Sequence, residues 1–157
     1  MNKLVIFDLD GVLIDSRDMH YEALNRALGN VDEKYVINRE EHLSVYDGLP
    51  TSRKLNLLTE RKGLPVDKHQ QVWEDKQVET LNIFGRLSND YELMHYFKQL
   101  KDKGYQVAVA SNSIRNTVKL VLLKLGLLEF IDYYISNEDV HRNKPFPEMY
   151  WQCMTAC

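Results

Sequence analysis

Short apolar runs alternate along the chain with longer segments in which apolar residues recur at helical spacing. Three such runs occupy residues 4–7, 107–110 and 133–135, and each is followed by polar residues. Runs of this length that are rich in β-branched and aromatic residues are typical of strands in a parallel sheet, and we expect the first to be fully buried. Strands that alternate with helices predict parallel βαβ units and therefore an α/β fold.

The segment from residue 16 to residue 84 contains no strand-like run. It is highly charged and keeps helical spacing, which predicts an all-helical insertion between two parts of a sheet domain, residues 1–15 and 85–157. Thr51 and Asp67 are the predicted N-caps of two of its helices. The other predicted helix boundaries are Asp15 or Ser16, the capping-box pair Asn38 and Glu41, and the terminal glycines Gly29 and Gly63.

The composition is that of an ordinary globular chain. Of the 157 residues 44% are hydrophobic and 27% are charged, and the formal net charge is −3. No basic cluster indicates nucleic-acid binding, and no apolar run approaches the roughly 20 residues of a membrane span. The N-terminus lacks a signal-peptide pattern, and Cys153 and Cys157 form neither a disulfide framework nor a zinc site. We therefore expect a cytoplasmic protein without nucleic-acid or membrane partners.

Two carboxylates and a glycine follow the first predicted strand. Asp8 and Asp10 are spaced i, i+2, and Gly11 suits a tight turn. Ligands of open α/β sheets bind beyond the carboxyl ends of the strands, where two acids serve as nucleophile and proton carrier or bind a hard cation. Such acids also cap helices or form Asx turns. A calcium-binding EF-hand loop is disfavoured, because Gly11 is the fourth residue from Asp8 and that loop needs glycine at its sixth.

Polar residues follow the other two predicted strands as well. Ser111, Asn112 and Ser113 offer hydroxyls and backbone N–H groups at a predicted helix N-terminus, which is an anion site unless the serines only cap the helix. Lys144 lies in a Lys-Pro-Phe-Pro turn, although a single lysine is usually just solvated. Together the three clusters supply acids, anion-binding hydroxyls and a cation at one sheet edge. Phosphoryl transfer requires this combination.

The three clusters resemble the first three motifs of the haloacid dehalogenase superfamily, in the same order along nearly the whole chain. The matching segments are residues 7–12, residues 111–113, and Lys144, Pro145 and Pro147. The resemblance implies a Rossmann-like, doubly wound parallel sheet. It also implies that residues 16–84 are a helical cap, as in the subfamily that includes β-phosphoglucomutase and phosphoglycolate phosphatase.

The resemblance also implies a role for each motif residue. Asp8 is then the nucleophile that forms an aspartyl-phosphate, and it ligates Mg²⁺. Asp10 protonates the leaving oxygen, activates the hydrolytic water and contacts the metal through its carbonyl oxygen. Lys144 offsets the negative charge of Asp8 and the phosphate. The implied phosphate-binding residues are Ser111, Asn112 and Gly11.

The cap residues implied to contact substrate are His20, Thr51 and Lys76. The arginine that the mutases carry near Thr51 is not matched cleanly, although Arg53 lies close in the sequence. The resemblance therefore favours a magnesium-dependent phosphatase of a small phosphorylated metabolite over a phosphomutase. A third alternative is a catalytically impaired remnant that acts as a binding protein.

The sequence departs from the family pattern after Lys144. The family's fourth motif, a strand that ends in acidic residues, has no counterpart in residues 145–157. The sheet is then incomplete at the C-terminus, and the magnesium site has fewer carboxylates. In the family's strand order the missing strands flank the first one. We therefore expect strand 4–7 to be an exposed edge, open to self-association, and the chain to be a fragment of a longer product.

Overall fold

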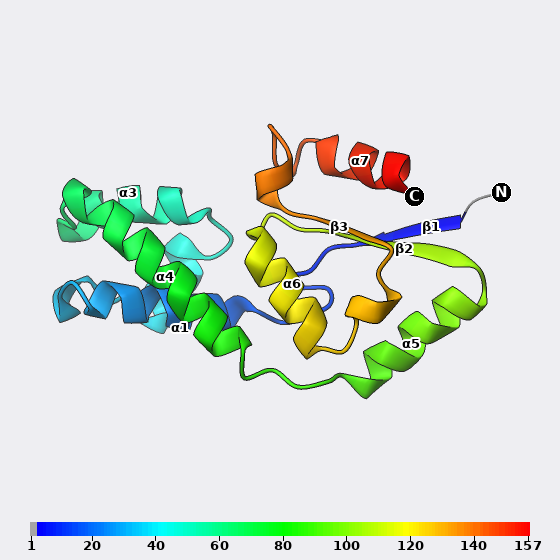
Figure 1. Ribbon diagram of the computed structural model, residues 1–157. Helices are drawn as coiled ribbons and strands as arrows, with labels where there is room; N and C mark the ends of the chain where they lie inside the picture. The colour runs from blue at the N-terminus through cyan, green and yellow to red at the C-terminus, as the bar shows by residue number, and fades with distance from the viewer. Residues whose placement is uncertain (1–2) are drawn as a thin grey trace. The chain divides into compact units, whose positions relative to one another are not determined.

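The computed structural model describes residues 3–157, which divide into two compact units (Figure 1). The sheet unit combines the N-terminal segment, up to Ser16, with Phe84–Cys157. The helical unit is Arg17–Ile83.

The sheet unit is built on three parallel strands. They are β1 (Lys3–Phe7), β2 (Tyr105–Ala110) and β3 (Tyr133–Ile135), in the order β1-β2-β3. Val5 pairs with Val107 and Ala108 with Tyr133 in the two ladders. The predicted α/β fold with a parallel sheet is thereby confirmed.

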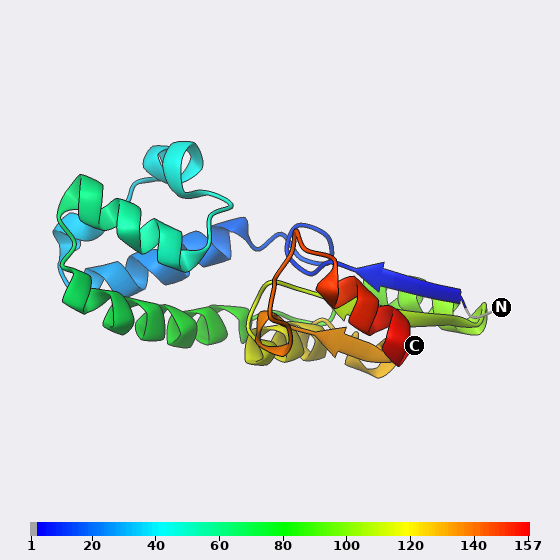
Figure 2. The same ribbon diagram turned by 90° about the horizontal axis from the view of Figure 1, so that it is seen from above.

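Helices cover both faces of this sheet (Figures 1 and 2). Helix α7 (Glu148–Ala156) lies on one face, whereas α5 (Tyr91–Asp102) and α6 (Arg115–Lys124) lie on the other. The core beneath α7 is formed by Ala108, Ala110, Ile135, Met149 and Cys153. The chain is thus wound on both sides of the sheet, as the resemblance to the haloacid dehalogenase superfamily implied.

The expectation of a fully buried first strand is wrong. Residues 4–7 of β1 are only half-buried, whereas the last four residues of β2 are fully buried. The reason is that β1 is an edge strand: within residues 3–157 it pairs with β2 alone. Phe7 is covered on one side by Phe97, whose ring stacks on it at 4.9 Å between centroids.

Asp132 joins the starts of β2 and β3. Its carboxylate accepts a hydrogen bond from the N–H of Val107 at 2.7 Å and pairs with Lys101, and its own N–H donates to the carbonyl of Val107 at 2.9 Å. Burial alone would raise the pKa of Asp132, but the hydrogen bonds from Lys101 and Val107 hold that pKa below its usual value.

Asp132→Asn is expected to lower the free energy of unfolding by about 1 kcal/mol at pH 7. A depressed carboxyl pKa contributes stability above the unfolded-state value, about 3.9, and that stability is lost as the pH falls through the folded-state pKa. Urea denaturation should therefore show that the difference in free energy of unfolding between variant and parent is smaller at pH 3 than at pH 7. An equal difference at both values of pH would show that the charge of Asp132 is irrelevant.

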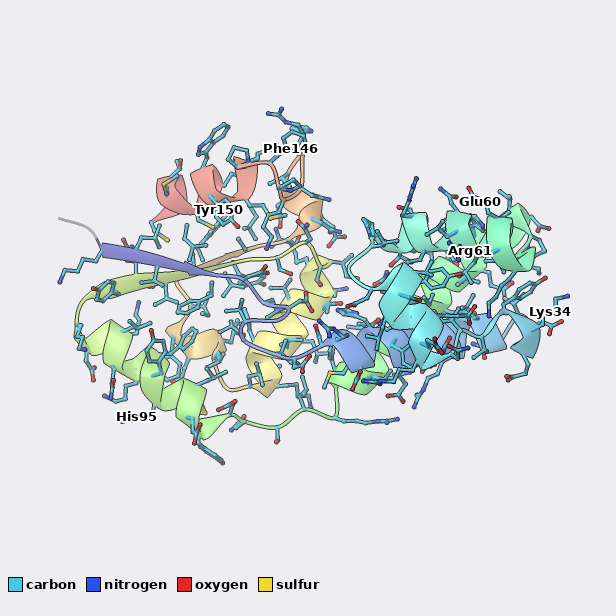
Figure 3. The ribbon with its side chains drawn as sticks, turned by 180° about the vertical axis from the view of Figure 1, so that it is seen from behind. Lys34, Glu60, Arg61, His95, Phe146 and Tyr150 are labelled. Carbon is cyan, nitrogen blue, oxygen red and sulfur yellow. The ribbon has the colours of Figure 1, made fainter. Side chains whose placement is uncertain are left out.

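The helical unit contains four α-helices and a π-helical turn. The α-helices are α1 (Arg17–Gly29), α2 (Arg39–Glu41), α3 (Thr51–Lys62) and α4 (His69–Phe84), which ends at the unit boundary; the π-helical turn is His42–Tyr46. Short 3₁₀ turns occupy Glu33–Tyr35 and Val66–Lys68 here, and Leu128–Phe130 and Asn137–Asp139 in the sheet unit. Leu55 and Leu58 of α3 face the unit's core, while Glu60 and Arg61 are exposed (Figure 3).

Two predicted helix starts differ from the structure. Pro50, not Thr51, occupies the N-cap of α3, and its extended backbone leads directly into the helix, so Thr51 is the first helical residue. Asp67 lies in a 3₁₀ turn, and α4 begins at His69. The capping box between Asn38 and Glu41 is confirmed. None of the helices described in residues 3–157 is long and apolar enough to cross a membrane.

Candidate active site

The polar clusters that follow the strands meet at the carboxyl ends of β1 and β2. Lys144, from the loop after β3, places its ammonium nitrogen 2.8 Å from Oδ1 of Asp8, which directly follows β1. The same ammonium group donates to the carbonyl of Ala110, the last residue of β2, at 2.9 Å. The structure therefore brings an acid and a cation from distant parts of the chain into contact.

Asp8 combines a fixed orientation with access to solvent. Its Oδ1 accepts a hydrogen bond from the N–H of Leu9 at 2.7 Å in addition to the Lys144 contact. Its side chain is 43% exposed, whereas that of Lys144 is 13% exposed. An exposed carboxylate held beside a largely buried cation has the orientation and the electrostatic surroundings of a nucleophile for a phosphate ester.

Asp10 is held by two hydroxyl groups. Ser113 donates to its Oδ2 at 3.0 Å, and Ser16 donates to its Oδ1. Ser113 is positioned in turn, because its N–H donates to Oγ of the fully buried Ser111 at 3.0 Å. The sequence indicated Ser113 as a candidate site residue, because it belongs to the polar cluster after the second strand. Nothing in the sequence singled out Ser16 as a partner of Asp10.

Asn112 fixes the loop that carries Lys144. Its side-chain nitrogen donates to the carbonyl of Lys144 at 3.0 Å, and its side-chain oxygen accepts from the N–H of Lys144 at 3.1 Å. The side chain of Asn112 therefore positions Lys144, the candidate cation. The sequence did not indicate this role for Asn112.

The cluster at residues 111–113 does not form the N-terminus of a helix. Helix α6 begins at Arg115 after Ile114 as N-cap, and the N–H of Arg115 donates to the carboxylate of Glu138 at 2.7 Å. A carboxylate from the loop after β3 thus caps the start of α6, so an anion site at residues 111–113 would not include the first N–H of that helix. Ser111 directly follows β2 instead, and its N–H donates to the carbonyl of Ile135 at 3.1 Å.

Asp139, beside Glu138, is also used within the fold. Its carboxylate accepts from the N–H and the hydroxyl of Ser136, and it pairs with Arg115. Burial alone would raise the pKa of Asp139, but these hydrogen bonds hold that pKa below its usual value. Glu138 and Asp139 therefore stabilise the loop, which leaves Asp8 and Asp10 as the candidate acids.

Gly11 supplies the turn that carries the chain away from Asp10. Its φ is +77°, a conformation that favours glycine, and its N–H donates to the carbonyl of Ile14 at 2.8 Å. A Cβ atom at this position would meet no heavy atom within 4 Å. The requirement for glycine here is therefore one of backbone conformation.

Among the described residues, the oxygen donors that the resemblance assigns to a magnesium ion are the carboxylate of Asp8 and the carbonyl oxygen of Asp10. No group of three or more His, Cys, Asp or Glu residues in the described part of the chain is arranged to hold a metal. Mg²⁺ is commonly held by one or two carboxylates together with phosphate oxygens and water. The oxygen donors of Asp8 and Asp10 fit such a site, although fewer protein ligands make a weaker one.

The three predicted substrate residues of the helical unit lie on three helices. His20 is half-buried on α1, Thr51 is half-buried at the start of α3, and Lys76 is buried on α4.

The family model for haloacid dehalogenase-like hydrolases matches residues 5–157. The chain belongs to this family. A phosphorylated carbohydrates phosphatase from Thermotoga maritima is 25% identical to it over 150 residues, which are 93% of the chain and 66% of that protein.

Solved structures of haloacid dehalogenase-like hydrolases share the fold. A predicted phosphoglycolate phosphatase from Haemophilus somnus is 21% identical, with a TM-score of 0.81 over 98% of this chain and 71% of its own. A β-phosphoglucomutase from Clostridium difficile is 22% identical, with a TM-score of 0.74 over 99% of this chain and 71% of its own. This haloacid dehalogenase-like chain thus spans about two thirds of the length of its relatives.

Proposed function

We propose that this haloacid dehalogenase-like hydrolase is a magnesium-dependent phosphatase that acts on a small phosphorylated metabolite through an aspartyl-phosphate. The observation that carries the proposal is the exposed Asp8 carboxylate, which is oriented by Lys144 at 2.8 Å next to the hydroxyl-bound Asp10. The phosphatase named among its relatives supports the reaction class.

The two carboxylates divide the reaction into two displacements at phosphorus. In the first, Asp8 attacks and forms an oxygen–phosphorus bond, the ester oxygen–phosphorus bond breaks, and protonated Asp10 gives its proton to the leaving alkoxide. In the second, Asp10 takes a proton from water as the water attacks phosphorus. The Asp8–phosphorus bond then breaks, which releases phosphate and restores the Asp8 carboxylate.

Phosphate binding is assigned to the loops that surround Asp8. Lys144 neutralises charge on the transferring group, and Ser111, the backbone amide of Asn112 and the turn at Gly11 contact its oxygens. Asp8 and Asp10 would hold Mg²⁺, which supplies further neutralisation of the phosphoryl oxygens when it is bound. These assignments rest on the placement of all six residues at the carboxyl ends of β1 and β2 and in the loop after β3.

We further propose that residues 16–84 act as a cap that selects the substrate, with His20, Thr51 and Lys76 as contacts. A cytoplasmic location is proposed because Cys153 and Cys157 are free thiols. Burial raises the pKa of Cys153 to about 11, so that thiol is unreactive at neutral pH.

The test is phosphate release from an aryl phosphate by the full chain with Mg²⁺, with Ca²⁺ and with a chelator. Turnover is expected with Mg²⁺ and not with Ca²⁺, because the larger ion prefers more ligands and a looser geometry. Equal turnover with and without a chelator would contradict the proposed metal dependence. A requirement for a bisphosphate activator would instead identify a phosphomutase.

The competing proposal is a catalytically impaired remnant that self-associates through the free edge of β1. Its apolar residues 4–7 are half-buried at an edge that no other strand of residues 3–157 covers, which favours pairing with a second copy. Sedimentation of the same preparation separates the two proposals. A concentration-dependent dimer without turnover in any metal would support the remnant.

A further inference from the structure

The loop that carries Lys144 has little packing of its own near that residue. It leads from β3 to α7 (Figure 1), and the side chains of His141, Arg142 and Asn143 in it are exposed. The ammonium group of Lys144 nevertheless lies 2.8 Å from Oδ1 of Asp8. Loops with few buried apolar contacts are the least stable parts of a fold, so hydrogen bonds to the backbone must hold this loop in place.

Glu148, the first residue of α7, supplies two of these hydrogen bonds. Its Oε1 accepts from the N–H of His141 at 2.8 Å, and its Oε2 accepts from the N–H of Arg142 at 3.1 Å. The hydrogen bond from His141, and to a lesser extent that from Arg142, hold the pKa of Glu148 below its usual value. The group is therefore a carboxylate at pH 7, and both of its oxygens are used by adjacent backbone groups of the loop.

The core of the sheet unit fixes the helix from which Glu148 reaches the loop. Met149, the next residue, and Cys153, one turn later, are fully buried beneath α7. The same helix makes a third contact with the loop, because the side-chain nitrogen of Gln152 donates to the carbonyl of Asp139 at 3.2 Å. Helix α7 is therefore anchored on its inner side and holds the loop through its polar side chains.

The contacts of Glu148 exceed what an acid in the first turn of a helix usually does. Such an acid commonly interacts only with the dipole of its own helix. Glu148 instead binds N–H groups six and seven residues before it, directly ahead of Lys144. On the other side, Asn112 binds both the N–H and the carbonyl of Lys144. The loop is therefore fixed from two sides, by the residue after β2 and by α7.

We propose that Glu148 is a positioning residue for Lys144, which holds the loop so that the ammonium group of Lys144 meets Asp8. This inference rests on the proposed function, in which Lys144 neutralises charge on Asp8 and on the transferring phosphate. A displacement of a catalytic group by about 1 Å can lower turnover by as much as about 10²-fold, so the anchoring of this loop matters for the reaction.

The first test is amide hydrogen exchange, measured by NMR on the full chain, and it needs no turnover. Glu148→Gln keeps the size of the side chain but replaces one acceptor oxygen by a donor. Exchange at the N–H groups of His141, Arg142 and Lys144 is expected to become about tenfold faster, the effect of losing a hydrogen bond to a charged group. Glu129→Gln, which changes an exposed glutamate of the sheet unit, is the matched control. Faster exchange at His141 and Arg142 with an unchanged rate at Lys144 would overturn the inference.

The second test is a double-mutant cycle on phosphate release. Glu148→Gln alone is expected to lower the turnover number about tenfold and to change KM less than about twofold. In the Lys144→Met background the same substitution is expected to have an effect of less than about twofold, because the group that Glu148 positions is gone. Glu148→Asp keeps the charge with a shorter reach and should retain part of the turnover. Effects that multiply in the double variant would show a merely structural role and overturn the inference.

The two measurements separate this inference from the proposed function. A parent chain without turnover would contradict the phosphatase, whereas the exchange rate at Lys144 would still decide whether Glu148 holds its loop. Thermal unfolding of each variant checks that the fold is intact. If Glu148→Gln unfolds, both measurements are made on Glu148→Asp, for which smaller changes in the same direction are expected.

Discussion

Asp8→Asn is expected to lower the turnover number for phosphate release at least about 10⁴-fold. Asparagine keeps the shape of the side chain and its contact with the N–H of Leu9, but its amide oxygen is a far weaker nucleophile than a carboxylate. The change also removes the charge that pairs with Lys144 at 2.8 Å. Steady-state phosphate release at saturating substrate and Mg²⁺ measures the loss.

Asp15→Asn is the matched control for Asp8→Asn. Asp15 is exposed in the same loop after β1 and undergoes the same chemical change. It should keep turnover within about twofold of the parent. Since the Asp8 side chain is 43% exposed, its replacement should leave the fold intact, which thermal unfolding would confirm. Loss of turnover in both variants would mean that these substitutions disturb the structure of the loop, and the loss in Asp8→Asn would then not identify a nucleophile.

Lys144→Met is expected to lower turnover by about 10²- to 10³-fold, the usual effect of removing one charged group that stabilises a transition state. Methionine preserves most of the buried stem but loses the contacts with Asp8 and with the carbonyl of Ala110. The charge on Asp8 and the phosphate is then no longer neutralised at the moment of attack.

Lys144→Arg tests whether position as well as charge matters. The Lys144 side chain is 13% exposed and its single ammonium group serves two acceptors, so the larger guanidinium is expected not to restore full turnover. Lys119→Met removes an exposed charge from α6 and controls for the loss of one positive charge. A Lys144→Met variant with a raised KM and an unchanged turnover number would show that Lys144 only binds the substrate.

The position of the candidate site could be predicted because it depends on a regularity of parallel sheets. Asp8, Ser111 and Lys144 each follow a strand, and the strands were recognisable from short apolar runs. The carboxyl ends of parallel strands lie at one edge, so contact between Lys144 and Asp8 followed from the topology. The structure agrees, with 2.8 Å between the two charged groups.

The supporting contacts could not be predicted, since they join side chains across long sequence separations. Ser113 reaches Asp10, and Asn112 clamps Lys144 from a different loop. Glu138 accepts a hydrogen bond from the N–H of Arg115 at the start of α6 in the same way, so the anion site proposed at residues 111–113 does not include that N–H. The periodicity of apolar residues predicts which side of a helix or strand is buried. It does not predict which side chains of different loops contact one another.

Burial of β1 was overestimated for a related reason. Its composition predicts a fully buried strand, whereas the lack of the family's fourth motif predicts an exposed edge. In residues 3–157 only β2 pairs with it, which agrees with the second expectation. The start of α3 was misassigned because Thr51 is a good N-cap by residue type, whereas the backbone of Pro50 already sets the helix entry. In both cases the residue types of a short segment favour one structure, and the surrounding structure (the sheet order for β1, the backbone of Pro50 for α3) determines another.

The measurement that tests the central claim most directly is the detection of a phosphate group on Asp8. The full chain would be mixed with an aryl phosphate and Mg²⁺, quenched in acid within milliseconds, digested, and analysed by mass spectrometry. We predict phosphate on the peptide that contains Asp8, labile to hydroxylamine as an acyl phosphate must be, and absent from the Asp8→Asn variant. Steady turnover without any phosphorylated peptide, or phosphate on another residue, would contradict the assignment of Asp8 as the nucleophile.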